Sequence, residues 1–120
     1  MSKLLIVDDE IDVREFAKNF FTRRKIETFV AAGGKEAIEI VKTQKPSLVL
    51  LDVRMEDMNG LDVLSEIKKI DKNIKVIMVS GVEEKDAIDK ARHLGALTFI
   101  HKPLVLDELE QIVLKELSVN

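Results

Sequence analysis

The 120-residue chain contains no cysteine, tryptophan or tyrosine, and it has only two prolines and five glycines. The absence of cysteine excludes disulfide scaffolds, cysteine-ligated zinc sites and thiol nucleophiles. A content of 46% hydrophobic and 34% charged residues excludes collagen-like, low-complexity and disordered chains. Folding of a chain this long hides about two-thirds of its unfolded surface, so we expect one domain spanning residues 1–120.

Long apolar runs and a strong excess of one charge are also missing. The longest apolar runs, such as residues 4–7, span four residues, whereas a membrane-spanning helix needs about 20. The net charge is −3, and residues 83–118 carry 8 acidic against 5 basic side chains. We therefore expect a cytoplasmic protein that neither enters a membrane nor contacts nucleic acid directly.

Short apolar runs alternate with helical patterns along the chain. Five runs are expected to be strands, at residues 3–8, 26–31, 48–52, 75–80 and 97–100. Apolar residues recur at helical spacing in the stretches 13–21, 37–41, 63–70, 87–94 and 106–117. Strands without a polar face need helices on both sides. The pattern predicts an α/β fold, a doubly wound open parallel sheet built from five βα units.

Polar side chains stand where these strands end. Five residues share this placement: Asp8, Asp9, Asp52, Ser80 and Lys102. Because parallel strands end at one edge of the sheet, where open α/β sheets build their sites, we expect these groups to converge.

Each of these residues also has a structural explanation when it is taken alone. Asp9 or Glu10 is well placed to cap the following helix, since acidic side chains accept from first-turn N–H groups. Ser80 suits a turn hydroxyl, and Lys102 suits a solvated surface amine. Asp52 is harder to explain in this way, because it ends a buried run where an unpaired charge is costly.

A cluster of carboxylates needs a cation. Two carboxylates about 4 Å apart repel by about 4 kcal/mol at an effective dielectric constant of roughly 20. Lys102 supplies one positive charge, and an all-oxygen ligand set suits Mg²⁺ or Mn²⁺ rather than zinc. A carboxylate nucleophile beside a hard cation, a lysine and a hydroxyl is typical of phosphoryl transfer, so Asp52 is the predicted acceptor.

Four motifs resemble those of response-regulator receiver domains. They are Val-Asp-Asp-Glu at 7–10, Leu-Leu-Asp-Val-Arg-Met at 50–55 with Gly60, Val-Ser-Gly at 79–81 and His-Lys-Pro at 101–103. The resemblance covers essentially the whole chain and implies a flavodoxin-like sheet with strand order 2-1-3-4-5. It also implies two-component signalling, in which a sensor histidine kinase, a phosphotransfer protein or a small acyl phosphate phosphorylates Asp52. The domain itself would supply the Mg²⁺-dependent transfer and the later hydrolysis, unlike a conventional turnover enzyme.

The resemblance also implies the ligands of the metal. Asp9 would bind Mg²⁺ directly and Asp8 would bind it through water. Asp52 and the backbone carbonyl of Arg54 would complete the protein ligands.

Further residues are implied to act after phosphoryl transfer. Lys102 would contact the phosphoryl group, and Ser80 would hydrogen-bond it. Phe99 matches an aromatic residue whose side chain turns inward as the hydroxyl moves, together with a change in the loop after Ser80. The Lys102–Pro103 peptide bond matches one that is usually cis in the family, against about 5% of such bonds generally.

The resemblance places the switched surface on the fourth helix, the fifth strand and the fifth helix. This face would bind an unknown downstream protein or output domain. The sequence leaves open whether phosphorylation also drives formation of a homodimer.

The chain departs from the family pattern at two positions near the site. Glu56 stands where receivers commonly have proline, so we expect a looser loop with an extra carboxylate near the metal. Ser80 stands where threonine is more frequent, which keeps the hydroxyl and loses a methyl group.

One alternative stays open, a receiver-like interaction module that keeps the fold and is never phosphorylated. A haloacid dehalogenase-type phosphatase fits poorly, because its nucleophile ends the first strand as Asp-x-Asp, and this chain has Asp8-Asp9-Glu10 there. A flavin carrier fits poorly too. Three consecutive acids repel a bound phosphate, and the chain has no tryptophan or tyrosine to stack on a flavin.

Overall fold

A computed structural model describes residues 2–81 and 85–117 of the chain. Strands and helices alternate throughout these residues, as the sequence pattern predicts. The elements are β1 (Lys3–Val7), α1 (Ile11–Thr22), β2 (Glu27–Ala31), α2 (Gly34–Gln44), β3 (Leu48–Asp52), α3 (Gly60–Ile70), β4 (Lys75–Ser80), α4 (Lys85–His93), β5 (Thr98–His101) and α5 (Leu106–Leu117).

The five strands form one parallel sheet in the order β2-β1-β3-β4-β5. This confirms the expected α/β class and strand order. The chain moves outward from β1 to β2 and then crosses to β3 on the other side of β1. The direction of winding therefore reverses between β1 and β3, and binding sites in open α/β sheets form beyond the strand ends at this point.

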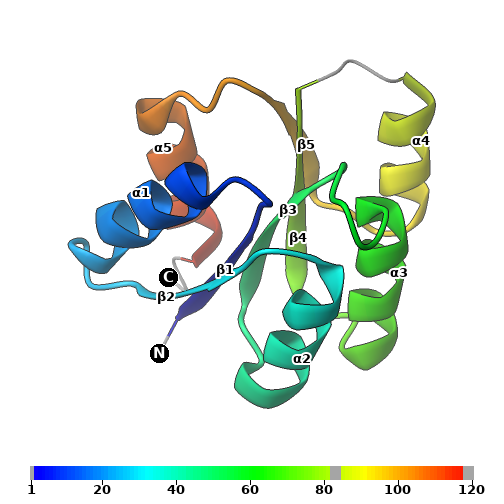
Figure 1. Cartoon of the computed structure of the whole chain (residues 1–120), viewed down its shortest axis with the longest axis horizontal. Coiled ribbons are helices and arrows are strands. Elements are labelled where there is room, and N and C mark those ends of the chain that lie inside the picture. The colour runs from blue at the N-terminus through cyan, green and yellow to red at the C-terminus, as the bar shows by residue number, and fades with distance from the viewer. Residues whose placement is uncertain (1, 82–84, 118–120) are drawn as a thin grey trace.

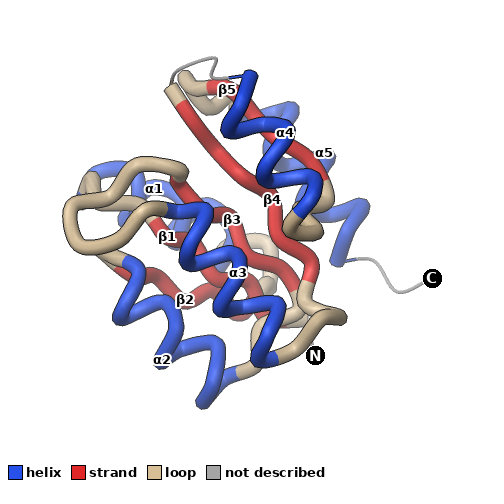
Figure 2. The backbone as a smooth tube through the Cα atoms, turned by 90° about the vertical axis from the view of Figure 1, so that its right-hand side faces the viewer, coloured by secondary structure: helices blue, strands red, loops and turns tan. Residues whose placement is uncertain are grey.

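Helices cover both faces of the sheet. Figure 1 shows α1 and α5 on one side and α2, α3 and α4 on the other. Figure 2 is turned so that the second group lies in front of the strands. Successive strand residues serve opposite faces, so Leu4 and Ile6 pack with α1 and α5, whereas Leu5 and Val7 pack with the other three helices. Each such buried side chain contributes about 1.5–3 kcal/mol through removal of apolar surface from water.

The helix ends differ in how well the sequence predicts them. The expected stops at Pro46 and Gly95 are confirmed, since α2 ends at Gln44 and α4 ends at His93. Gly95 adopts a φ of 100°, a conformation that glycine reaches without strain. Leu94, expected within the fourth helix, lies just beyond α4.

Within the described residues, no helix has the length and apolar character needed to cross a membrane.

The structural alternative for Glu10, capping of α1 through its side chain, is wrong. Glu10 is the N-cap residue, but its side chain makes no capping hydrogen bond. Its backbone N–H instead donates to Asp8 Oδ1 at 2.9 Å. The chain therefore turns from β1 into α1 around the Asp8 carboxylate.

Candidate functional site

The strand ends bring four of the predicted polar residues to one edge of the sheet. Asp8 follows β1, Asp52 ends β3, and Ser80 ends β4. Lys102 follows β5 directly, and its backbone N–H donates to the Ser80 carbonyl oxygen at 2.7 Å. The regular parallel register thus aligns residues that lie far apart in the sequence.

A lysine ammonium group joins two of the carboxylates. Lys102 Nζ lies 2.9 Å from Asp52 Oδ2 and 3.1 Å from Asp8 Oδ2. Glu10 Oε1 is farther from the same nitrogen, at 3.8 Å. Asp8 and Asp52 are only 4% and 6% exposed, so their charges are largely withdrawn from water and need a nearby cation. The structure brings Asp8, Asp52 and Lys102 together, as we expected.

Backbone donors fix the orientation of both carboxylates. Asp52 Oδ1 accepts from the Arg54 N–H at 3.1 Å, and Asp8 Oδ1 accepts from the Glu10 N–H at 2.9 Å. Arg14 Nη1 also donates to the Asp8 carbonyl at 2.8 Å, a contact that the sequence did not predict. Each carboxylate therefore has one oxygen held by the backbone while Oδ2 faces Lys102.

The site shifts the pKa values of its two central groups. Burial raises the pKa of Asp52, and the charge of Asp8 adds to this effect, whereas hydrogen bonds from Lys102 and the Arg54 N–H oppose it. Burial acts to lower the pKa of Lys102, but its hydrogen bonds with Asp52 and Asp8 outweigh burial and the pKa is raised. Lys102 therefore stays positively charged at neutral pH.

An acidic group suited to a cation lies beside this pair. Asp8, Asp9 and Glu10 each offer a carboxylate oxygen within 4.8 Å of the others. Asp8 is buried, whereas Asp9 and Glu10 are exposed. Donors that are all oxygen, next to the additional carboxylate of Asp52, fit a hard divalent cation such as Mg²⁺.

Asp8 and Asp9 of this acidic group are expected metal ligands. Glu10 is not, because the sequence predicts only a capping role for it. Its position as the third consecutive acid after Asp8 and Asp9 was the sequence signal that could have placed it in the group. Lys102 contacts both Asp52 and Asp8, so Asp52 lies next to this acidic group. The Arg54 carbonyl stays a predicted ligand.

Of the residues expected to switch, Ser80 ends β4 next to Lys102, and Phe99 lies within β5. Ser80 is 3% exposed, and Phe99 is partly buried with its ring centroid 5.4 Å from that of His101. The Lys102–Pro103 peptide bond is cis, as expected. The loop after Ser80 includes residues 82–84, which lie outside the described residues, so its movement stays a prediction.

The segment of residues 53–59, which we call the β3–α3 loop, is closed at its base. The Gly60 N–H donates to the Val53 carbonyl at 2.7 Å, and Arg54 forms an antiparallel bridge with Asn59. A Cβ added to Gly60 would lie 2.2 Å from the Asp52 carbonyl oxygen, so only glycine permits this close approach.

The tip of the β3–α3 loop is also held, which differs from the looser loop expected without proline at position 56. Asp57 Oδ1 accepts from the Gly34 N–H at 2.9 Å, and Asp57 Oδ2 accepts from the Lys35 N–H at 3.1 Å. These backbone hydrogen bonds lower the pKa of Asp57. Glu56, the expected extra carboxylate, is exposed and lines a hollow that Asp9 also lines.

Comparison with known proteins identifies the family. Residues 4–114 match the model of the response regulator receiver domain. The chain belongs to this family. This receiver domain is 41% identical over 118 residues to sporulation initiation phosphotransferase F of Bacillus subtilis, covering 98% of the chain and 95% of that protein.

Two solved structures resemble this receiver domain over nearly its whole length. The response regulator TrrA of Thermotoga maritima, in complex with Mg²⁺ and BeF, has a TM-score of 0.86 and 31% identity, covering 98% of this chain and 100% of that one. The CheX–CheY–BeF₃–Mg²⁺ complex of Borrelia burgdorferi gives a TM-score of 0.87 and 33% identity, covering 95% of this chain and 87% of the matched one.

Proposed function

We propose that this receiver domain accepts a phosphoryl group on Asp52 in a Mg²⁺-dependent reaction and so relays a two-component signal. The observation that carries the proposal is the buried Asp52 carboxylate in contact with Lys102 at 2.9 Å, beside the acidic group of Asp8, Asp9 and Glu10. Similarity to a sporulation phosphotransferase and to a response regulator bound to Mg²⁺ and BeF supports it.

The residues would divide the work of phosphoryl transfer. Asp8, Asp9, Asp52 and the Arg54 carbonyl would hold Mg²⁺, or Mn²⁺ with the same preference for oxygen. The bound cation would neutralise the phosphoryl oxygens and align them for in-line displacement. Lys102, already paired with Asp52, contributes a second positive charge to the developing phosphoryl group.

The chemistry is a transfer followed by a hydrolysis. An oxygen of Asp52 bonds to phosphorus, while the bond from phosphorus to the donor breaks and the donor keeps the electron pair. The donor is a phosphohistidine of a sensor histidine kinase or phosphotransfer protein, or a small acyl phosphate. Water later cleaves the aspartyl phosphate, so the domain acts as a phosphoacceptor with autodephosphorylation. We propose that it acts in the cytoplasm, where histidine kinases obtain ATP, and that residues 1–120 form one receiver domain.

Phosphorylation would then change the α4–β5–α5 face. It adds nearly two negative charges to Asp52, which attract Lys102 and give the Ser80 hydroxyl a new acceptor. Movement of Ser80 would let Phe99 turn inward. Apolar side chains on or beside these elements, Leu97 and Leu114, are already 46% and 42% exposed, which suits docking of a target protein, an output domain or a second copy of the chain.

The test is the intact mass of the protein after incubation with acetyl phosphate and Mg²⁺. We expect a single phosphoryl adduct that disappears when Mg²⁺ is chelated and in the Asp52→Asn variant. No adduct in the wild-type protein, with acetyl phosphate or phosphoramidate, would contradict the proposal. That result would favour the unphosphorylated interaction module.

A further inference from the structure

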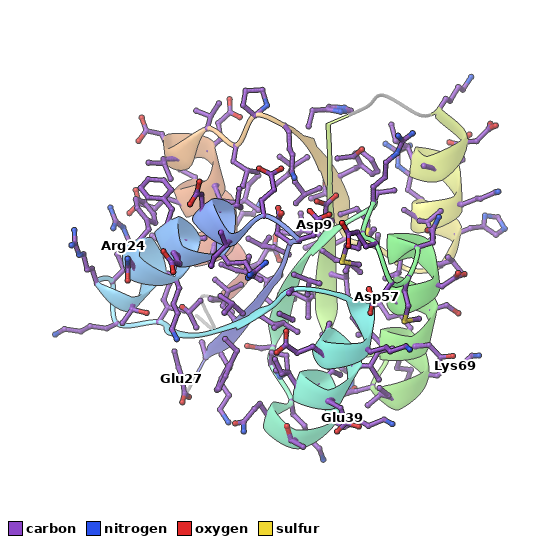
Figure 3. The ribbon with its side chains drawn as sticks, viewed as in Figure 1. Asp9, Arg24, Glu27, Glu39, Asp57 and Lys69 are labelled. Atoms are coloured by element: carbon purple, nitrogen blue, oxygen red, sulfur yellow. The ribbon has the colours of Figure 1, made fainter. Side chains whose placement is uncertain are left out.

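The α2 helix begins without a capping side chain of its own. Its N-cap residue is Gly33, which has no side chain to accept from the first-turn N–H groups. Asp57 of the β3–α3 loop supplies both acceptors, one oxygen to the Gly34 N–H and one to the Lys35 N–H. Figure 3 shows Asp57 beside the beginning of α2. One carboxylate thus joins the loop after Asp52 to α2, the neighbouring helix on the same face of the sheet as α3.

The helix is shaped to receive the loop tip. A Cβ added to Gly33 would lie 2.6 Å from Asp57 Oδ1, and one added to Gly34 would lie 2.9 Å from Met58 Cβ. Gly33 has φ −159° and ψ 180°, an extended conformation open to any residue. A side chain at position 33 would therefore displace the Asp57 carboxylate, although the backbone there accepts any residue.

The tethered loop leads directly to the predicted cation site. Asp57 and Asp9 line the same hollow of about 440 Å³. Three residues before Asp57, Arg54 donates its N–H to Asp52 Oδ1 and carries the carbonyl predicted to bind the cation. The loop is thus fixed at its base by the Arg54–Asn59 bridge and at its tip by Asp57, with the predicted ligands alongside.

We propose that Asp57 is a positioning residue for the cation site: by holding the tip of the β3–α3 loop on α2, it keeps Asp52 and Arg54 arranged to bind Mg²⁺. The inference rests on the proposed function, because it needs that cation site. When the tether is absent, the loop visits other conformations, and only the binding-competent fraction takes up the ion. The apparent affinity then falls in proportion to that fraction.

Three variants separate positioning from charge and from helix capping. Asp57→Ala removes the tether together with one negative charge. Glu56→Ala removes one negative charge from the same loop tip and leaves the tether, so it measures the effect of charge alone. Gly33→Ser gives α2 a capping hydroxyl of its own, while its Cβ occupies the space of the Asp57 carboxylate.

The measurements are Mg²⁺ affinity by calorimetric titration and amide hydrogen exchange at Arg54 and Gly60 in the Mg²⁺-free protein. We expect Asp57→Ala to bind Mg²⁺ about fivefold more weakly than its charge-matched control Glu56→Ala. Gly33→Ser should bind Mg²⁺ about fivefold more weakly than wild type. Both variants should also exchange these two amides faster, and Gly33→Ser should keep a melting temperature near that of wild type.

Two results would overturn the inference while leaving the proposed function intact: Asp57→Ala binding Mg²⁺ as tightly as Glu56→Ala, or Gly33→Ser binding it as wild type does with unchanged exchange. A wild-type protein that binds no Mg²⁺ would overturn both proposals. The affinity of the wild-type protein therefore distinguishes the two failures.

Discussion

Lys102 is the single ammonium group within contact distance of both buried carboxylates among the described residues, at 2.9 Å from Asp52 and 3.1 Å from Asp8. Removing one member of a buried charged group leaves the others uncompensated, which typically costs about 3–5 kcal/mol. In the Mg²⁺-free site, Lys102 therefore supplies the positive charge that compensates Asp8 and Asp52.

We therefore expect Lys102→Ala to lower the free energy of unfolding by about 3 kcal/mol without Mg²⁺, and by less with it. The matched control is Lys75→Ala, because the Lys75–Glu116 ion pair is partly exposed and should contribute less than about 1 kcal/mol. Urea denaturation measures the free energy of unfolding of both variants.

The same substitution tests the role of Lys102 in switching. Phosphorylated Lys102→Ala should show no change on the α4–β5–α5 face, and a normal change on that face in this variant would refute the role of Lys102 in switching.

Asp52 gives a prediction about pH. Because burial raises its pKa in the folded protein, the folded state binds this proton more tightly than the unfolded chain does. The contribution of Asp52 to stability is therefore favourable at acidic pH and is lost as the pH rises through the folded pKa. Mg²⁺-free Asp52→Asn should be more stable than wild type at pH 7, and the difference should shrink as the pH falls through the raised folded pKa and level off below about pH 4. Thermal unfolding across pH checks this, and a difference that grows on acidification would contradict it.

At the scale of elements, the start of α3 depends on Gly60. A Cβ there would lie 2.2 Å from the Asp52 carbonyl oxygen and 2.7 Å from Val53 Cα, and backbone atoms cannot move aside cheaply. We expect Gly60→Ala to destabilise the protein by about 2–3 kcal/mol. Gly81→Ala is the control, since its Cβ would meet only Lys102 Cβ at 3.9 Å. Equal denaturation midpoints for the two variants would contradict this account of the loop base.

The elements themselves could be predicted because their signals are local. The run of residues 48–51 has no polar face, which indicates a strand buried on both sides, and β3 is buried throughout. The convergence of Asp8, Asp52 and Lys102 followed from the common direction of parallel strands.

Two features near the site could not be predicted, because they depend on tertiary packing. Glu10 occupies the N-cap of α1, yet the Asp8 carboxylate takes its backbone N–H. Asp57 caps α2 from a different loop, and no sequence pattern connects these distant positions. The available hint was Gly33, a helix start without a side chain that could cap it.

At the scale of the whole molecule, cation binding should stabilise the fold. A ligand that binds only the folded state adds about 2.7 kcal/mol when its concentration is 100 times its dissociation constant. We expect millimolar Mg²⁺ to raise the melting temperature of the wild-type protein, and to raise it less in Asp9→Asn. Calorimetry or circular dichroism measures the shift, and an unchanged melting temperature would show that the metal assignment is wrong.

The central claim is that phosphoryl transfer occurs at Asp52 and at no other carboxylate of the site. Borohydride reduces an aspartyl phosphate to homoserine, so peptide mass spectrometry after treatment with acetyl phosphate, Mg²⁺ and borohydride locates the modified residue. The account predicts homoserine at position 52 alone, and none without Mg²⁺. Homoserine at position 8, 9 or 57, or unmodified Asp52 in a phosphorylated sample, would contradict it.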